Sequence, residues 1–130
     1  MKTKAIKQAI IFKTEPHEVY EAFMDEKKHS EFTGSKAKIS RKTNGKFSIY
    51  DGAIEGENLE IVQDKKIVQK WRYEDWPENH YSTITLILKK DKKGTKMEFT
   101  QVGIPEDKYE AIKQGWIDYY WNPMKEMLEA

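Results

Sequence analysis

Histidines and carboxylates are the side chains of this sequence that could move protons or bind a metal ion. The three histidines, His17, His29 and His80, lie far apart in the chain and form no His-x-x-His pair, so they do not predict a metal site. His80 belongs to the stretch WPENH, where a solvent-facing loop histidine is the expected role rather than a catalytic base. Carboxylate pairs such as Glu55 and Glu57 mean little among 22 acidic residues, and nothing indicates the burial that an acid–base pair needs.

Motifs for other chemistries are also missing. No Gly-x-Ser-x-Gly turn suits acyl transfer, and no glycine-rich loop joins a strand to a helix to hold a nucleotide phosphate. The absence of cysteine excludes disulfides, thiolate nucleophiles and cysteine-bound zinc. The 23 basic and 22 acidic residues nearly cancel, so no charge field favours nucleic acid or an anionic membrane. We expect a protein that is not an enzyme and that uses no metal and no cofactor.

Aromatic residues are the more informative set, because four of them fall in the nine-residue stretch GWIDYYWNP near the end of the chain. Such ring surface predicts a compact core, the wall of a ligand cavity or a docking face for another protein. Polar residues at otherwise inward positions favour the cavity slightly, since a buried polar group needs a partner, a water or a ligand. The candidate cavity residues are Trp71, Tyr73, Ser82, Phe99, Gln101, Trp116, Tyr119 and Tyr120, with Trp76 and His80 in a loop at its mouth.

The N-terminal segment predicts a strand followed by two short helices. Residues 5–13, AIKQAIIFK, alternate so that Ile6, Gln8, Ile10 and Phe12 share one face. The next stretch, TEPHEVYEAF, has a proline suited to a first helical turn. In DEKKHSEF, an aspartate caps the second helix and a phenylalanine anchors it.

Residues 35–102 predict antiparallel hairpins. The pairs Asn44-Gly45, Asp51-Gly52 and Gln63-Asp64 are turn signals between alternating apolar runs. Alternate residues give one dry face, which we expect to be covered by another element. Its predicted members are Phe47, Ile49, Leu59, Ile61, Ile67, Trp71, Tyr73, Ile84, Leu86, Leu88, Met97 and Phe99.

Residues 106–128 predict the covering helix. Its apolar residues span roughly 200° of the helix circumference, more than a helix resting on a sheet needs, so part of it must contact a second surface. Pro123 cannot donate a hydrogen bond to the carbonyl of Tyr119, which predicts a bend or an early end. Trp121 lies at the margin of the sheet-facing stripe; we expect it in the core, and exposure would instead mark a protein-binding patch.

This element order predicts an α+β fold with residues 1–130 as a single domain. A curved antiparallel sheet of about seven strands should hold the long C-terminal helix in its concave face, with the two short helices after the first strand at one end of a cavity. The apolar run AIIF, residues 9–12, is too short for a signal peptide or a membrane span. We therefore expect a soluble, cytoplasmic protein without membrane insertion.

Several motifs of the second half occur in an order that is similar to a known family. They are Lys70-Trp71-Arg72, Trp76-Pro77 and Gly115-Trp116, within KIVQKWRYEDWPENHYSTITLIL and QGWIDYYW. With these motifs the chain resembles the C-terminal domain of the activators of heat shock protein 90 ATPase. That family lies within the START-like helix-grip superfamily (SRPBCC, Bet v 1-like), and the likeness in element order covers nearly the whole chain.

The resemblance implies a helix-grip fold and leaves two functions to compare. The first is a non-enzymatic START-like domain that binds a small apolar or amphipathic ligand between sheet and C-terminal helix. The alternative is a co-chaperone-like domain that binds heat shock protein 90 and modulates its ATPase, with a role in the stress response. Ligand binding is the leading expectation, because in eukaryotic activators a separate N-terminal domain supplies much of the chaperone contact.

Overall fold

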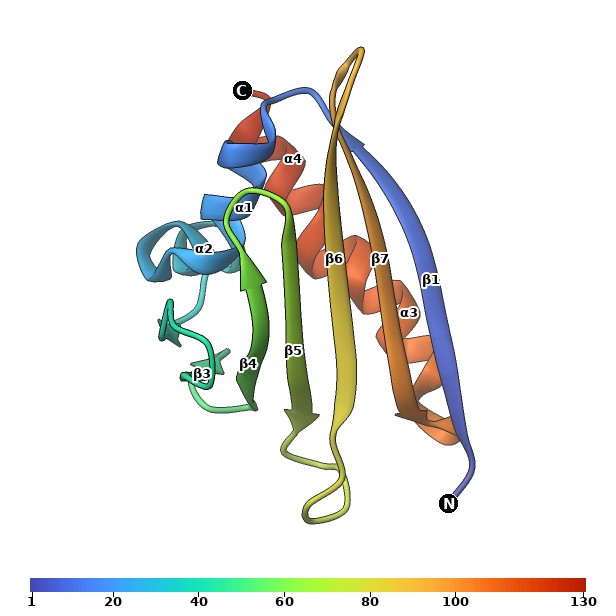
Figure 1. Cartoon of the computed structure of the whole chain (residues 1–130). Helices are drawn as coiled ribbons and strands as arrows, with labels where there is room; N and C mark the ends of the chain where they lie inside the picture. Colours follow the sequence, from blue (N-terminus) through green and yellow to red (C-terminus); the bar gives the residue numbers. More distant parts are fainter.

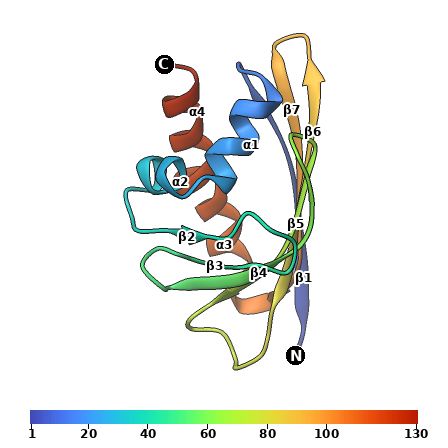
Figure 2. The ribbon, with the colours of Figure 1, turned by 60° about the vertical axis from the view of Figure 1, so that its left-hand side comes forward.

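The structure, a computed structural model that describes residues 1–130, is a curved seven-stranded antiparallel sheet with its helices on the concave side (Figures 1 and 2). The strand order is β1-β7-β6-β5-β4-β3-β2. The strands are β1 Thr3–Phe12, β2 Lys38–Ile39, β3 Lys46–Ile49, β4 Ile54–Val62, β5 Lys66–Tyr73, β6 Ser82–Asp91 and β7 Gly94–Pro105. The helical elements are α1 Pro16–Met24, α2 Glu26–Thr33, η1 Glu106–Lys108, α3 Tyr109–Trp116, η2 Ile117–Trp121 and α4 Asn122–Leu128. The predicted helix-grip fold is confirmed.

The two short helices begin where the sequence predicted. α1 starts at Pro16 after an extended Glu15, whose side chain makes no capping bond. The carboxylate of Asp25 accepts a hydrogen bond from the backbone N–H of Lys28 and so caps α2. Gly34 ends that helix with a φ of 72°, a left-handed conformation in which glycine carries no steric penalty.

The dry face of the sheet holds the predicted residues, with one correction on β4. The pairing of β4 with β5 shifts between Asn58 and Glu60, so one extra residue interrupts the alternation. Leu59, predicted to face inward, is therefore 37% exposed, and Asn58 is fully buried in its place. The Asn58 side-chain amide donates to the carbonyls of Ser40 and Lys42, which ties β4 to the turn before β3.

The turn between β3 and β4 lies one residue earlier than its sequence signal. Gly52 donates its N–H to the carbonyl of Ile49, so Tyr50 and Asp51 occupy the centre, with φ values of 52° and 53°. This conformation costs free energy in a tyrosine, because its Cβ crowds the backbone there. The position brings the Tyr50 ring close to the C-terminal helix, where it contacts Tyr120.

The predicted helical segment runs from residue 106 to residue 128, and Pro123 leaves a mark on it. Residues Ile117–Trp121 form a π turn, in which Asn122 donates its N–H to the carbonyl of Ile117, five residues back. Proline supplies no N–H to the carbonyl of Tyr119, so the ordinary α-helical bond at this point cannot form. The wider turn carries the helix past the proline to Leu128.

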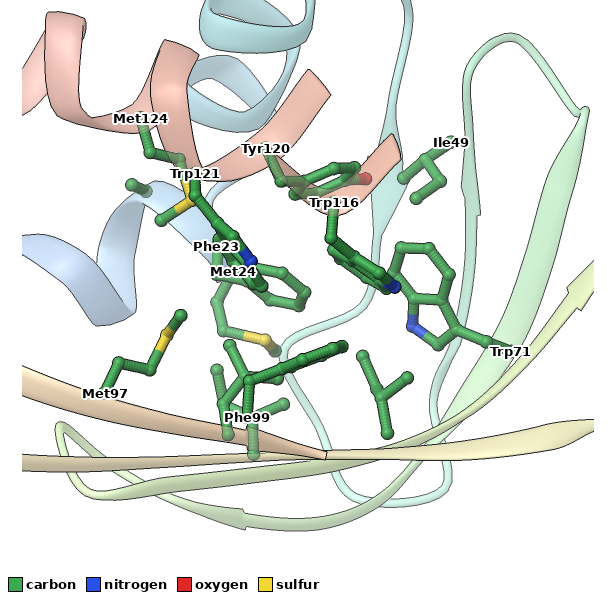
Figure 3. Packing of buried hydrophobic residues seen from close by; sticks show 14 of the residues in the cluster. Phe23, Met24, Ile49, Trp71, Met97, Phe99, Trp116, Tyr120, Trp121 and Met124 are labelled. Atoms are coloured by element: carbon green, nitrogen blue, oxygen red, sulfur yellow. The ribbon is translucent and has the colours of Figure 1, made fainter. Parts of the chain in front are cut away.

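Aromatic side chains fill the space between the helix and the sheet (Figure 3). Trp71 from β5 and Trp116 from α3 are 1% and 2% exposed, and their ring centres lie 4.9 Å apart. Trp121 is also buried, which confirms the expectation of a core residue. The helices α1 and α2 pack against α4 and η2 and form the second surface that the wide apolar arc required.

Candidate functional site: an apolar cleft beside the C-terminal helix

A cleft of about 480 Å³ lies between α3, the β3–β4 turn and the β5–β6 loop. We call it the α3 cleft. Ten of its 13 lining residues are hydrophobic, and the volume falls in the range of small-ligand pockets. The lining comprises Tyr50, Ala53, Ile54, Tyr73, Asp75, Trp76, Lys108, Ala111, Ile112, Gly115, Trp116, Tyr119 and Tyr120.

The helical wall of the cleft owes its shape to a missing side chain. Lys108, Ala111, Gly115 and Tyr119 follow one another at spacings of three and four, so they form one stripe along the helix. A Cβ added to Gly115 would meet only a ring carbon of Tyr119, at 3.8 Å. Glycine costs stability in a helix interior, and here it leaves open space rather than a tight packing contact.

The opposite wall is the strained β3–β4 turn. The hydroxyl of Tyr50 donates to the carbonyl of Tyr119, at 3.5 Å. That carbonyl is the one whose α-helical partner Pro123 cannot supply. One tyrosine therefore connects the two walls of the cleft and donates to the carbonyl that the proline leaves without its α-helical partner.

The β5–β6 loop at the end of the cleft is held by backbone contacts. The Arg72 guanidinium donates to the carbonyls of Trp76 and Pro77, at 2.6 and 3.2 Å. Trp76 stacks on Tyr73 with ring centres 5.1 Å apart. His80, placed at the mouth by the sequence prediction, uses Nε2 to donate to the carbonyl of Gly103 at 2.8 Å and does not line the cleft.

An ion pair marks the mouth. The Lys108 ammonium lies 3.0 Å from a carboxylate oxygen of Asp75. The hydrogen bond and the charge of Asp75 raise the pKa of Lys108 above its usual value. Both side chains reach water, so the pair links the loop to the helix without contributing much stability.

Half of the predicted cavity set lies elsewhere, and three of those four residues belong to a chain of buried hydrogen bonds. Trp71, Ser82, Phe99 and Gln101 are buried and do not line the cleft. The Trp116 indole donates to Gln101 at 2.7 Å, Gln101 donates to Ser82 at 2.9 Å, and Ser82 donates to the carbonyl of Trp71 at 3.0 Å. These polar groups were expected to need a partner, a water or a ligand, and they are partners of one another.

Gln69 extends this chain on β5. It accepts a hydrogen bond from the Trp71 indole at 2.8 Å and donates to Asn58 at 2.9 Å. No buried side-chain nitrogen or oxygen is left without a partner. Two polar side chains on the inner face of the sheet, Gln69 and Gln101, thus accept hydrogen bonds from the buried indoles of Trp71 and Trp116.

The two neighbouring tyrosines of the helix point in different directions. Tyr119 was expected to face inward, but it is 63% exposed and forms the rim of the cleft. Tyr120 is buried instead and donates its hydroxyl to Nε2 of His29, at 2.9 Å. Burial raises the pKa of the Tyr120 hydroxyl and that of Tyr73, so both stay neutral.

His29 is, like Asn58, a buried polar residue that sequence reasoning missed. Its Nδ1 lies 2.9 Å from the carbonyl of Phe23 and therefore carries the proton, which leaves Nε2 to accept from Tyr120. Burial lowers the pKa of His29 to about 4, against a smaller raising effect of the Phe23 carbonyl. One signal was available, since His29 precedes Phe32 by three residues on the same face of α2.

No three histidine or acidic side chains come together in a way that could hold a metal ion. The helices include none with the length and apolar character needed to cross a membrane.

Comparison with known proteins matches nearly the whole chain to one family. The family model described as activator of Hsp90 ATPase homolog 1-like protein matches residues 13–129. The activator of 90 kDa heat shock protein ATPase homolog 1 of Homo sapiens is 39% identical over 116 residues, 88% of this chain. The Dictyostelium discoideum homolog is 36% identical over 115 residues. This chain spans only about a third of these relatives, 34% and 30% of their lengths.

A solved structure described as an HSP90 activator from Plasmodium falciparum superposes with a TM-score of 0.85 and 30% identity. The match covers 98% of this chain and 96% of that one. A protein from Mesorhizobium loti is only 18% identical at a TM-score of 0.84, which shows the shared fold and nothing further.

Proposed function

Since this chain belongs to the family of activator of Hsp90 ATPase homolog 1-like proteins, we propose that it binds a heat shock protein 90 chaperone and modulates its ATPase. This was the alternative of the sequence analysis, and it now takes precedence over ligand binding. The chain acts in this proposal as a non-enzymatic partner in the cytoplasm, and the ATP chemistry remains with the chaperone.

One observation carries the proposal. The Plasmodium falciparum protein described as an HSP90 activator is matched over 96% of its own chain in that structure, so the likeness includes no second domain. The resemblance stated above implies that in eukaryotic activators a separate N-terminal domain supplies much of the chaperone contact. A match of about equal length supports a chaperone function for a domain of this size.

Co-purification and an ATPase assay test the proposal. Immobilised chain is incubated with the purified heat shock protein 90 of the source organism, and the chaperone's ATP hydrolysis is measured as the chain is titrated. We expect retention of the chaperone and an ATPase rate that changes to a plateau. ATP hydrolysis that persists when a specific heat shock protein 90 inhibitor is added is subtracted as background. No retention together with an unchanged rate would remove the proposal.

Binding of a small apolar ligand is the second candidate, and the α3 cleft is the observation that favours it. The polar groups that could orient a ligand already have hydrogen-bond partners within the chain, because the Trp116 indole binds Gln101 and the Tyr120 hydroxyl binds His29. A ligand would therefore be held by contact with ring surfaces more than by hydrogen bonds. Titration with lipids and aromatic compounds should change the tryptophan fluorescence, and a flat response across a broad set of compounds would count against it.

A further inference from the structure

We infer that the α3 cleft is the surface that contacts the chaperone, and that it receives apolar side chains from a lysine- or arginine-rich segment of that partner. The inference rests on the proposed function and adds to it a binding surface and the chemistry of the bound segment.

The apolar part of the occupant follows from the lining. Ring faces and short aliphatic groups cover the cleft, and the stripe of Ala111 and Gly115 lets an incoming side chain approach the helix. Tyr119, 63% exposed at the rim, offers the aromatic surface that often carries binding energy in protein interfaces. Apolar side chains of a partner segment fit such a groove, as in other helix-in-groove complexes.

The charge of the occupant follows from the residues around the cleft. The three segments that supply the lining, residues 50–54, 73–78 and 106–119, contain eight acidic and two basic residues, although the whole chain has 22 acidic and 23 basic residues. Lys108, one of the two basic residues, is already paired with Asp75. A positively charged partner segment is therefore attracted to this rim and a negatively charged one is repelled. Of the eight acidic residues, all exposed, only Asp75 lines the cleft itself and the others belong to the flanking segments; they are Asp51, Glu74, Asp75, Glu78, Glu106, Asp107, Glu110 and Asp118.

The walls of the cleft are fixed before any partner arrives. Arg72 holds the β5–β6 loop by two backbone carbonyls, and Tyr50 ties its turn to the helix. A preformed surface loses little conformational entropy on binding, so more of the contact energy remains as affinity.

A matched pair of substitutions at Gly115 tests the apolar contact. Gly115→Leu projects a side chain into the cleft, and Gly115→Ala makes the same gain in helix propensity with little filling. Affinity for the heat shock protein 90 of the source organism is measured by fluorescence anisotropy with labelled chain. We expect binding at least about tenfold weaker for Gly115→Leu and a several times smaller loss for Gly115→Ala, because a single methyl group fills less of the cleft.

A second pair tests the charge. The double reversal Asp107→Lys and Asp118→Lys, at two positions beside the lining stripe of the helix, should weaken binding roughly three- to tenfold and flatten its dependence on salt concentration. Glu98→Lys is the control, because Glu98 lies on β7 between the buried Met97 and Phe99 and so faces the opposite side of the sheet. Its only ion pair, 3.8 Å from Lys89, is exposed, and the reversal should leave binding unchanged.

The outcomes separate the inference from the proposed function. If the wild-type chain binds the chaperone, and Gly115→Leu and the double reversal bind it equally well, the inference is overturned and the proposed function stands. No wild-type binding overturns the proposed function, and a synthetic amphipathic lysine–leucine peptide then decides whether the cleft binds such a segment. If the tryptophan fluorescence of the wild-type chain does not respond to that peptide, or responds equally in Gly115→Leu, the inference is overturned as well.

Discussion

Gln101→Met is the most informative perturbation of the buried hydrogen-bond chain. Gln101 is fully buried, accepts from the Trp116 indole at 2.7 Å and donates to Ser82 at 2.9 Å. Methionine has a similar length and shape, so the packing of the core is largely kept. The Trp116 N–H, however, is left buried without an acceptor, while Ser82 keeps its bond to the carbonyl of Trp71.

The expected loss follows from these partners. A buried donor without an acceptor costs about 1–3 kcal/mol, and the lost bond to Ser82 adds about 1 kcal/mol. The gain from burying an apolar side chain offsets part of this, so the free energy of unfolding should fall by about 2–3 kcal/mol. For a domain of this size the melting temperature should fall on the order of 10 °C.

Urea unfolding followed by far-ultraviolet circular dichroism gives the free energy without relying on tryptophan fluorescence. The same substitution is then made in a Trp116→Phe background, where no indole N–H remains. We expect Gln101→Met to cost at least about 1 kcal/mol less there than in the wild type. Equal costs in the two backgrounds, or a wild-type-like stability of Gln101→Met alone, would refute the reasoning.

The remaining predictions concern a histidine, two glycines and a tyrosine. The folded-state pKa of His29 is about 4, below the usual histidine value of 6.5, so the unfolded chain binds more protons between these pH values. The contribution of neutral His29 to the free energy of unfolding is therefore fully present above about pH 6.5, and about 3 kcal/mol of it is lost as the pH falls towards 4. Urea unfolding at both pH values should show that the free energy of unfolding depends less on pH in His29→Gln than in the wild type. Gly115→Ala should raise the free energy of unfolding by up to about 1 kcal/mol, because the site is helical and open. Gly56→Ala should lower it by more than about 3 kcal/mol, because its Cβ would lie 1.8 Å from the carbonyl oxygen of Lys70; a normal thermal melt would contradict this. Tyr50→Phe should cost less than about 1 kcal/mol, because its bond is long and exposed, and a larger loss would mean that this contact is stronger than its geometry indicates.

The strands and helices could be predicted because their signals are local. Alternating apolar residues fix the faces of β1, β5 and β6, and the Asp25 cap and Pro16 mark where the two short helices begin. Leu59 was misplaced because the bulge depends on how β4 pairs with β5. An alternation pattern carries no information about such a shift between strands.

The cleft was harder to predict than the fold, because it depends on what each polar group binds. Gln101 and Ser82 looked like ligand contacts in sequence, yet their partners come from other strands and from the helix. Tyr119 and Tyr120 are adjacent, and the sequence did not distinguish the one on the rim from the one that binds His29. Gly115 shapes the cleft through the side chain that it lacks, which no residue-type motif reveals.

The pairing of β1 with β7 has a consequence for how the chain folds. The first strand has a single neighbour in the sheet, with Phe12 opposite Thr95 and Thr3 opposite Pro105. The chain between β1 and β7 forms a long loop, and closing it costs conformational entropy before the contacts between the two strands form. Domains with such distant pairings fold in milliseconds to seconds rather than microseconds. During synthesis on the ribosome, β1 must wait unpaired until β7 has emerged. Its lysines at positions 4 and 7 then protect it, since charge on an unpaired strand discourages association with other nascent chains.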